Sequence, residues 1–427
     1  MLEINKIKNN PDLIIESLKK RGINLKDKID LILNLNQRRV FNQKDLDNSL
    51  RQGNQIAQKI GKLAQEGNID NLTELKKNAS TLKNKARDLS DKAKEIELEI
   101  KKTLVDIPNT PHTKVPLGNN EKDNVIEFEW GEINDNEKLL PHWELAEKYN
   151  IIDFKKGAKI TGSGFPLYIG MGAKLQRALI NFFLDYNTNS GYTEYIPPYF
   201  VNSESAYNTG QLPDKEGMMY HIQNDDLYVI PTAEVPITNI FSNSKFKEEE
   251  LPIKCTAYSP CFRREAGSYG KEVRGLNRLH QFDKVEIVQI CTQKNSYNTL
   301  DNMVEHISNL LKQLGLTFRI IKLCGGDLGF TSALTYDFEI YAPAQKKWLE
   351  VSSVSNFETY QANRLNLKYT NKEGEKLFCH TLNGSSLALP RIVVGILEKY
   401  QTNDGIIIPK ALLKYLNFDK ITIDNNV

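Results

Sequence analysis

The chain has 427 residues, of which 40% are hydrophobic and 26% are charged, a composition typical of a globular protein with two or three domains. Its five cysteines include no CxxC pair, which argues against a structural zinc site and favours a reduced, intracellular compartment. The first residues lack the apolar core of a signal peptide and no apolar run approaches 18 residues, so neither secretion nor a membrane span is expected.

Charge is unevenly distributed along the chain, although the formal net charge is only +2. Residues 1–110 hold 22 Lys and Arg against 16 Asp and Glu, whereas the remaining residues hold 34 against 38. A basic amino-terminal part on a mildly acidic body indicates a nucleic-acid-binding appendage. The alternative is a lysine-rich helical surface produced by coding bias.

A heptad pattern dominates the amino-terminal part. Steps of three and four residues from Leu72 to Thr103 meet ten positions, of which nine are apolar, and no Gly or Pro interrupts them. Such a seam needs a partner helix, and a similar spacing upstream runs through Leu46, Leu50, Gly53, Ala57, Ile60 and Ala64. Gly67 and Asn68 lie between the two and can make a tight reversal. We therefore expect an antiparallel helical hairpin over residues 27–103.

The segment "DIPNTPHTKVPLGNN" predicts a proline-rich linker at residues 106–120, because its three prolines and its glycine oppose regular structure. The linker separates an amino-terminal domain, residues 1–105, from a second domain at residues 121–427. In the second domain, three amphipathic helices are expected, and they are interspersed with strand-like segments without a βαβ rhythm. This order predicts an α+β fold with an antiparallel or mixed sheet flanked by helices. The expected helices lie at 172–188, 296–315 and 389–401, and the expected strands at 227–231, 255–265, 282–290, 336–342 and 347–355.

The stretch "CFRREAGSYGKEVRGLNRLHQFDKVEIV" carries a dense set of arginine and carboxylate side chains suited to ligand binding. Strand alternation places Arg263 and Glu265 on one face, and Phe282 and Glu286 on one face of the next strand. A glycine-containing loop of about a dozen residues joins the two strands. A connection of this length is typical of a loop that takes part in binding or catalysis. Guanidinium groups bind phosphate, an aromatic ring stacks on a base, and a carboxylate binds Mg²⁺ or an ammonium group. The alternative is a surface hairpin laced with salt bridges.

The glycine-rich phosphate loops are absent from the sequence. There is no GxxxxGK[ST], and "GSGFPLYIGMG" does not have the GxGxxG spacing. If a nucleotide binds, arginines must therefore take the place of a glycine-rich loop.

The same stretch resembles the second signature motif of class II aminoacyl-tRNA synthetases, and more narrowly that of the bacterial-type seryl-tRNA synthetase family. "GYTEYIPPYF" is similar to the first class II motif, with its dimer-interface proline at Pro198, and "PTAE" is similar to the serine-site loop. "EVSSVSNFETYQANR" resembles the strand that binds metal and ATP, and "HTLNGSSLALPRIVVGILEKYQ" resembles the third motif. The expected hairpin and linker stand where this family has its tRNA-binding arm and linker.

The resemblance implies a class II antiparallel sheet, a cytoplasmic homodimer and a two-step reaction. Serine and ATP form seryl-adenylate and pyrophosphate, and the seryl group is then transferred to tRNA(Ser), which the helical arm binds. The implied catalytic residues are Arg263, Glu265 and Arg391. The implied serine-binding residues are Thr232, Ala233, Glu234, Arg263, Glu286 and Ser385. The implied ATP-binding residues are Arg263, Arg264, Glu265, Arg278, Leu279, Phe282, Glu350, Val351, Ser352, Ser353 and Arg391, and those for Mg²⁺ are Glu350 and Ser353.

Two positions depart from the family pattern. Arg264 stands where a small residue is common, and alternation directs its side chain to the opposite face, so no catalytic loss is expected there. "GSGFPLYIG" lacks an Arg-Phe pair often found at that place, which leaves the role of this loop open.

Two other functions compete with the synthetase hypothesis. A ligase that loads an amino acid on a carrier protein would share the catalytic body but lack the long arm. A catalytically inactive RNA-binding or coiled-coil scaffold would be expected to lose Arg263, Glu350 or Arg391, and all three are present.

Overall fold

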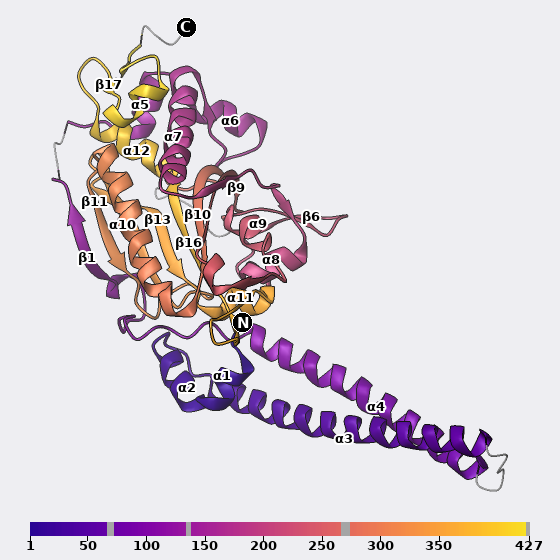
Figure 1. Ribbon diagram of the computed structural model, residues 1–427. Coiled ribbons are helices and arrows are strands. Elements are labelled where there is room, and N and C mark those ends of the chain that lie inside the picture. The colour runs from indigo at the N-terminus through magenta and orange to yellow at the C-terminus, as the bar shows by residue number, and fades with distance from the viewer. Residues whose placement is uncertain (66–71, 134–137, 266–273, 424–427) are drawn as a thin grey trace. The chain divides into compact units, whose positions relative to one another are not determined.

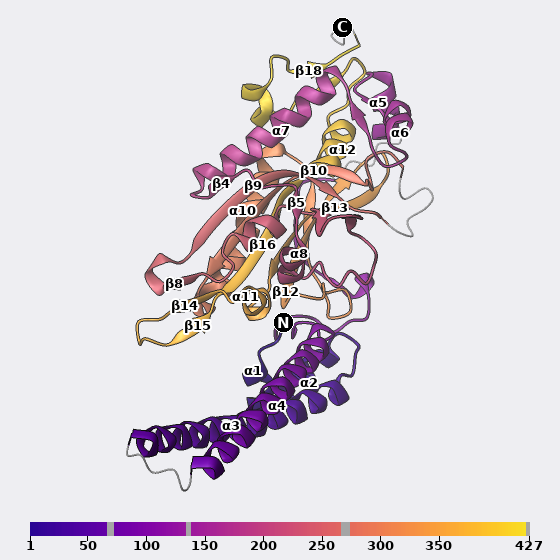
Figure 2. The ribbon, with the colours of Figure 1, turned by 90° about the vertical axis from the view of Figure 1, so that its right-hand side faces the viewer.

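The structure is a computed structural model that describes residues 1–65, 72–133, 138–265 and 274–423. The chain forms two compact units, of which the first comprises Met1–Lys19 and Ile23–Pro108, and the second comprises Lys20–Gly22 and Asn109–Val427. Figure 1 and Figure 2 show the elements of both units.

The first unit is helical. Two short helices, α1 (Ile4–Asn9) and α2 (Pro11–Lys19), precede two long ones, α3 (Lys26–Gln65) and α4 (Leu72–Val105), which run antiparallel to each other (Figures 1 and 2). At about 1.5 Å per residue, α3 extends roughly 60 Å and α4 roughly 50 Å. The prediction of an antiparallel two-helix arm is confirmed. The reversal expected at Gly67 and Asn68 lies outside the described residues.

The predicted heptad seam is correct for α4 and correct at every second position for α3. All ten predicted seam positions of α4, from Leu72 to Thr103, are buried or half-buried. In α3, however, the predicted seam residues Leu50, Ala57 and Ala64 are exposed. The predicted residues Leu46, Gly53 and Ile60 are half-buried, and between them the seam passes through Ser49, Ile56 and Leu63. The buried Asn42 continues this seam on the amino-terminal side.

Polar side chains explain why the α3 seam could not be read from apolar spacing. Asn42 donates its Nδ2 hydrogen to the Leu89 carbonyl of α4 at 2.8 Å, and the Ser49 hydroxyl donates to the Asp45 carbonyl at 2.9 Å. Because these hydrogen bonds satisfy their polar atoms, both side chains can occupy the interface.

The second unit is built around an eight-stranded sheet with the order β1-β11-β12-β13-β16-β10-β9-β4. Neighbouring strands are antiparallel except for β4, which pairs with β9 in parallel. The strands are β1 (Val125–Trp130), β11 (Phe318–Lys322), β12 (Leu334–Ala342), β13 (Lys347–Asn356), β16 (His380–Ala388), β10 (Gln281–Cys291), β9 (Ile253–Phe262) and β4 (Thr193–Tyr195).

Helices α5 (His142–Lys148), α7 (Gly170–Asn189), α10 (Ser296–Leu314) and α12 (Leu389–Lys399) supply the apolar side chains that close one face of the sheet. From β10, Val285 and Ile287 enter this core, whereas Lys284 and Glu286 alternate with them and belong to the opposite face. The opposite face therefore bears the polar side chains of β10 that are available to a ligand.

Smaller elements surround the sheet. The remaining helices are α6 (Phe154–Ile160), α8 (Ser203–Thr209), α9 (Glu234–Asn239) and α11 (Thr359–Leu365). The remaining strands are β2 (Ile152–Asp153), β3 (Leu167–Tyr168), β5 (Phe200–Val201), β6 (Tyr220–Ile222), β7 (Leu227–Val229), β8 (Lys245–Lys247), β14 (Lys368–Thr370), β15 (Lys376–Phe378), β17 (Ile406–Ile407) and β18 (Lys420–Ile421).

The three helices and five strands expected in this unit are all present, as α7, α10, α12, β7, β9, β10, β12 and β13. The central strand β16 was not predicted, because Asn383, Gly384, Ser385 and Ser386 give it weak strand propensity. Pairing with β13 on one side and β10 on the other holds it in place. None of the described helices is both long enough and apolar enough to cross a membrane.

The seam of the first unit yields a prediction about stability. Leu35 is fully buried in α3, whereas Leu50 on the same helix is 50% exposed. Leu35→Ala should lower the local unfolding free energy of the first unit by about 2–4 kcal/mol, because it leaves a cavity where a fully buried side chain stood. The matched control Leu50→Ala should change it by less than about 0.5 kcal/mol. Native-state hydrogen exchange measures both, and equal effects would contradict the assigned seam.

Candidate active site

The site begins where β9 ends. The antiparallel register pairs Phe262 with Gln281, and the Arg263 backbone N–H continues the pairing by donating to the His280 carbonyl at 2.9 Å. Glu265 has a φ of 47°, a left-handed conformation that is uncommon for a residue with a side chain. Simple strand alternation therefore does not place Glu265, because the strand has ended before it. The residues 266–273 that follow lie outside the described part of the chain.

A single cavity brings together residues from three strands, two connecting segments and a helix. Its lining comes from the residues after β9, the segment before β10, the strands β10, β13 and β16, and the start of α12. The lining residues are Arg263, Glu265, Leu276, Asn277, Arg278, Leu279, Phe282, Lys284, Glu350, Val351, Ser352, Ser385, Ala388, Pro390 and Arg391. Most of the residues implied for ATP binding are in this set. Arg264 and Ser353 are not.

Three arginines line the cavity in different electrostatic settings. Arg278 forms an ion pair with Glu265, so its charge is already balanced. The Arg263 guanidinium carbon lies 5.3 Å from the centre of the Phe282 ring, within the range of a cation–π contact. Arg391 donates from Nε to the Asn277 carbonyl at 3.0 Å and from Nη1 to the Glu350 carbonyl at 2.6 Å.

The contacts of Arg391 leave its charge available to a ligand. The carbonyl oxygens of Asn277 and Glu350 accept its hydrogen bonds but carry no net charge. A guanidinium held in this way is oriented and still cationic, which suits the binding of phosphate.

Beside the cavity lies a pair of buried carboxylates, Glu234 at the start of α9 and Glu286 on β10. They are 6% and 1% exposed. The Asn383 amide donates to both, at 2.7 Å to Glu234 and 3.3 Å to Glu286, and so links them. Gln361 donates to the other Glu234 oxygen at 2.7 Å, and Lys284 pairs with Glu286 at 2.8 Å.

The electrostatics of this pair favour a positively charged ligand. Burial, together with the nearby Glu286 carboxylate, raises the pKa of Glu234 from 4.5 to about 7. Among the described residues, Lys284 is the cation that acts on both carboxylates, so the ionised pair carries excess negative charge. An ammonium group placed here would stabilise the ionised form of Glu234.

Hydroxyl groups border the same pair. The Thr232 hydroxyl donates to Glu286 at 3.3 Å and accepts from the Glu234 backbone N–H at 3.2 Å. Ser385 lies 3.5 Å from the same carboxylate, between the pair and the main cavity that it also lines. Ala233 is fully buried in an apolar cluster with Ile237, so its side chain does not face the pair.

A third cluster on β12 and β13 contains Ser353, Asp337 and Glu350. Ser353 donates its hydroxyl hydrogen to Asp337. Burial raises the pKa of the Asp337 carboxyl well above its usual range, and the Glu350 carboxylate raises it further. Among the described residues, no group of three or more His, Cys, Asp or Glu side chains could hold a metal ion. The cluster therefore offers oxygen ligands but not a complete metal cage.

Sequence reasoning missed five residues of this site, namely Asn277, Lys284, Asp337, Gln361 and Asn383. Alternation with Ser385 and Glu286 on their strands could have indicated Asn383 and Lys284. Asp337 is opposite Ser353 only because β12 and β13 pair in a particular register. No local pattern distinguishes Gln361 on α11 or Asn277 in its loop.

Comparisons with known proteins agree along the whole chain. The model of the seryl-tRNA synthetase N-terminal domain matches residues 1–111, and that of the tRNA synthetase class II core domain (G, H, P, S and T) matches residues 219–400. The chain is 46% identical to the serine--tRNA ligase of Salinibacter ruber over 424 residues, covering 99% of each chain. It is also 46% identical to that of Caldicellulosiruptor saccharolyticus, covering 99% of this chain and 100% of the relative.

A solved structure gives the same result. The crystal structure of seryl-tRNA synthetase from Pyrococcus horikoshii complexed with ATP superimposes with a TM-score of 0.91 at 33% sequence identity, covering 99% of each chain.

The raised pKa of Glu234 predicts how stability depends on pH. Between about pH 4.5 and pH 7, folded Glu234 keeps a proton that the unfolded chain has lost. Its contribution to stability is therefore complete below pH 4.5 and is lost as the pH rises to about 7. Glu234→Gln has no such proton to lose.

Relative to the wild type, Glu234→Gln should accordingly gain roughly 2–3 kcal/mol of unfolding free energy on going from pH 4.5 to pH 8. Denaturant unfolding of both chains at several pH values measures this gain. A difference that stays constant with pH would contradict the raised pKa.

Proposed function

Because the chain belongs to the seryl-tRNA synthetase family, we propose that the main cavity binds ATP and that the Glu234–Glu286 pair beside it binds serine. The family activity is the ATP-dependent activation of serine and its transfer to tRNA(Ser). The observation that supports this assignment is the convergence of three arginines and an aromatic ring on one cavity, next to a buried pair of carboxylates. A cationic phosphate subsite thus adjoins an anionic amine subsite.

The arginines divide the work of binding ATP. Arg263, which lines the cavity, bridges the serine carboxylate and the α-phosphate. Arg391 binds the outer phosphates with its uncompensated charge, and Arg278 joins it after exchanging Glu265 for a phosphate oxygen. Phe282 stacks on the adenine, and Glu265 contacts the adenine from the side.

Serine is held by its two charged ends and its hydroxyl. Glu234 and Glu286 bind the ammonium group, and Thr232 orients Glu286 through its hydroxyl. Glu286 and Ser385 are the groups that read the serine hydroxyl. Alanine, which lacks this hydroxyl, would leave buried polar atoms without partners and is thereby disfavoured.

The reaction needs no covalent bond to the enzyme. An oxygen of the serine carboxylate attacks the α-phosphorus, the bond to the β-phosphate oxygen breaks, and pyrophosphate leaves with that electron pair. A ribose hydroxyl at the end of tRNA then attacks the carbonyl carbon of seryl-adenylate, and AMP leaves. The chain contributes alignment of the reactants and stabilisation of charge on the phosphate oxygens.

Glu350 and Ser353 fit Mg²⁺ brought in with ATP. Their oxygen atoms are the ligand type that Mg²⁺ prefers, and this ion commonly uses one or two carboxylates together with substrate phosphates. The charge repulsion between Asp337 and Glu350 supports this assignment, because a cation would relieve it. When bound, Mg²⁺ neutralises phosphate charge.

The helical arm of the first unit is assigned to tRNA binding. Its α3 and α4 expose many lysines, and the seryl-tRNA synthetase N-terminal domain model covers both helices. The long arm disfavours a carrier-protein ligase, and the retained Arg263, Glu350 and Arg391 disfavour an inactive scaffold.

We further assign a homodimer and a cytoplasmic location. Ile196, adjacent to the edge strand β4, is 86% exposed in the segment that resembles the first class II motif. An exposed apolar residue at such an edge suits burial against a second copy. All five cysteines are unpaired and buried, which is compatible with a reducing compartment.

The general test is pyrophosphate exchange and tRNA charging with serine, threonine and alanine. Serine-dependent exchange together with charging of tRNA(Ser) is expected. Serine-dependent exchange without charging would favour a carrier ligase, and no exchange with any amino acid would favour a scaffold.

Arg263→Ala should abolish seryl-adenylate formation, with exchange reduced at least about 1,000-fold, because a stabilising charge at the α-phosphate is lost. Arg263→Lys should fall between this variant and the wild type, since it keeps the charge but not the bidentate fork. tRNA binding, measured by filter retention, should be largely unchanged in both variants. Near-normal exchange by Arg263→Ala would refute the assigned role.

Removal of residues 30–100 should spare serine activation and abolish tRNA charging.

A smaller excision is safer for folding, because the Asn42–Leu89 hydrogen bond shows that α3 and α4 lie side by side at this level. Replacing residues 43–88 with a short glycine linker retains the buried Ile32, Leu35, Ile96 and Ile100. Exchange should stay within twofold of the wild type, and kcat/KM for tRNA should fall at least about 100-fold. Unimpaired charging would remove the arm from the mechanism.

A further inference from the structure

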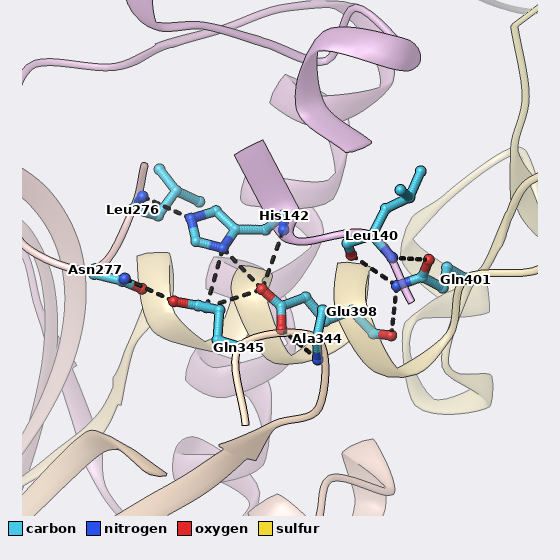
Figure 3. Close-up of polar contacts among 8 residues, drawn as sticks. All are labelled: Leu140, His142, Leu276, Asn277, Ala344, Gln345, Glu398 and Gln401. Atoms are coloured by element: carbon cyan, nitrogen blue, oxygen red, sulfur yellow. Dashed lines mark hydrogen bonds and ion pairs between the residues drawn. The ribbon is translucent and has the colours of Figure 1, made fainter. Parts of the chain in front are cut away.

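We propose that His142 and Glu398 are positioning residues for ATP, which act by holding the Leu276–Asn277 segment and, through it, Arg391. Neither side chain lines the cavity, and both are fully buried between α5 and α12. The proposal rests on the proposed function of the cavity as the ATP site. Figure 3 shows the network.

His142 is fixed in one tautomer by a backbone donor. The Leu276 N–H donates to Nε2 at 2.9 Å, so this nitrogen carries no proton. The ring proton is therefore on Nδ1, from which it is donated to the Glu398 Oε1 atom at 3.0 Å. The imidazole thus links the Glu398 carboxylate on α12 to the Leu276 backbone, which lines the cavity.

Glu398 is itself held by four donors, so it can serve as the fixed end of this relay. Besides the imidazole, Oε1 accepts from the His142 backbone N–H at 3.1 Å and from Gln345 Nε2 at 2.8 Å. Its Oε2 atom accepts from the Ala344 N–H at 3.1 Å. Gln345 Nε2 also lies 3.3 Å from His142 Nδ1, but in this tautomer both are donors that converge on Glu398.

Asn277 connects the network to the phosphate-binding arginine. Its side-chain amide donates to Gln345 Oε1 at 2.9 Å, and its carbonyl accepts from Arg391 Nε at 3.0 Å. Leu276, Asn277 and Arg391 all line the cavity. The chain of contacts from Glu398 to Arg391 is therefore continuous on both routes, through His142 and through Gln345.

The residues just before this segment also rest on α5. Gly275 has a φ of 70°, and a Cβ there would lie 2.2 Å from His142 Nε2. The Arg274 guanidinium lies 4.6 Å from the centre of the Trp143 ring. The His142 and Trp143 rings thus contact three consecutive residues, 274–276. In this way α5 supports the described segment that leads into β10.

The experiment measures the ATP and serine KM values of His142→Leu and His142→Gln in pyrophosphate exchange. His142→Leu loses both ring hydrogen bonds, and its KM for ATP should rise at least about tenfold while that for serine stays within twofold. The carbonyl of His142→Gln can still accept from the Leu276 N–H, so its KM for ATP should recover to within about threefold of the wild type.

Tyr400→Phe is the matched control. Tyr400 directly follows α12, the helix of Glu398, and does not line the cavity. The substitution removes its hydrogen bond of 2.8 Å to the Leu314 carbonyl at the end of α10. Its KM for ATP should stay within twofold. If His142→Leu lowers only the melting temperature and the fraction of active protein, with an unchanged KM for ATP, the proposal is wrong.

Coupling to Arg391 distinguishes positioning from a general loosening of the cavity. In an Arg391→Lys background, His142→Leu should raise the KM for ATP less than threefold further, and a full tenfold rise would overturn the proposed route. If His142→Leu does not fold, Gln345→Leu, which cuts only the second route, should raise the KM for ATP at least threefold, and no rise would overturn the proposal.

Equilibrium ATP binding by calorimetry separates this inference from the proposed function. Absence of serine-dependent pyrophosphate exchange in the wild-type chain would contradict the proposed function. In that case, the same loss of ATP affinity in His142→Leu would still support the positioning role, and unchanged affinity would refute it.

Discussion

The alternation of side chains along β13, β16, β10 and β9 is the constraint on which the site depends. Residues such as Val285 and Ile287 are committed to the core beneath the helices, so Glu286 between them must belong to the opposite face. A register slip of one residue would carry this carboxylate into the apolar core. Burial of apolar surface therefore decides which polar groups are presented to ligands.

The ion pairs among the arginines and carboxylates of the site then determine which of their charges remain for a ligand. Glu265 neutralises Arg278, and Lys284 neutralises one member of the carboxylate pair. Arg391 is held instead by two carbonyl oxygens, and its charge remains for a ligand. In a partly buried setting such charges interact more strongly than they do in water. The result is a cationic subsite beside an anionic one, which suits a nucleotide next to an amino acid.

The arm follows different physics, because two helices alone bury little apolar surface. Its seam mixes Leu, Ile and Ala with the polar Asn42 and Ser49. Asn42 donates a hydrogen bond across the interface to α4, and Ser49 donates one to the backbone of its own helix. A polar residue in a helical seam can specify register at some cost in stability. A long, narrow arm with this seam presents much more solvated surface than core.

The sequence by itself determined the two long helices, the main strands and helices of the body and most residues of the cavity. These features follow from periodicity, from breakers such as the linker prolines, and from motifs whose residues are close in sequence or resemble those of a known family. It did not reveal β16, whose pairing on both sides outweighs the weak propensity of its Asn, Gly and Ser residues.

Only the tertiary structure decided the polar positions of the α3 seam, the partners of Glu234 and the support of Arg391. His142 and Glu398 are 256 residues apart, and Gln361 reaches Glu234 across 127 residues. Contacts at such separations depend on how α5, α11 and α12 pack against the sheet. Local patterns record the propensities of neighbouring residues but not the packing that brings distant polar groups together.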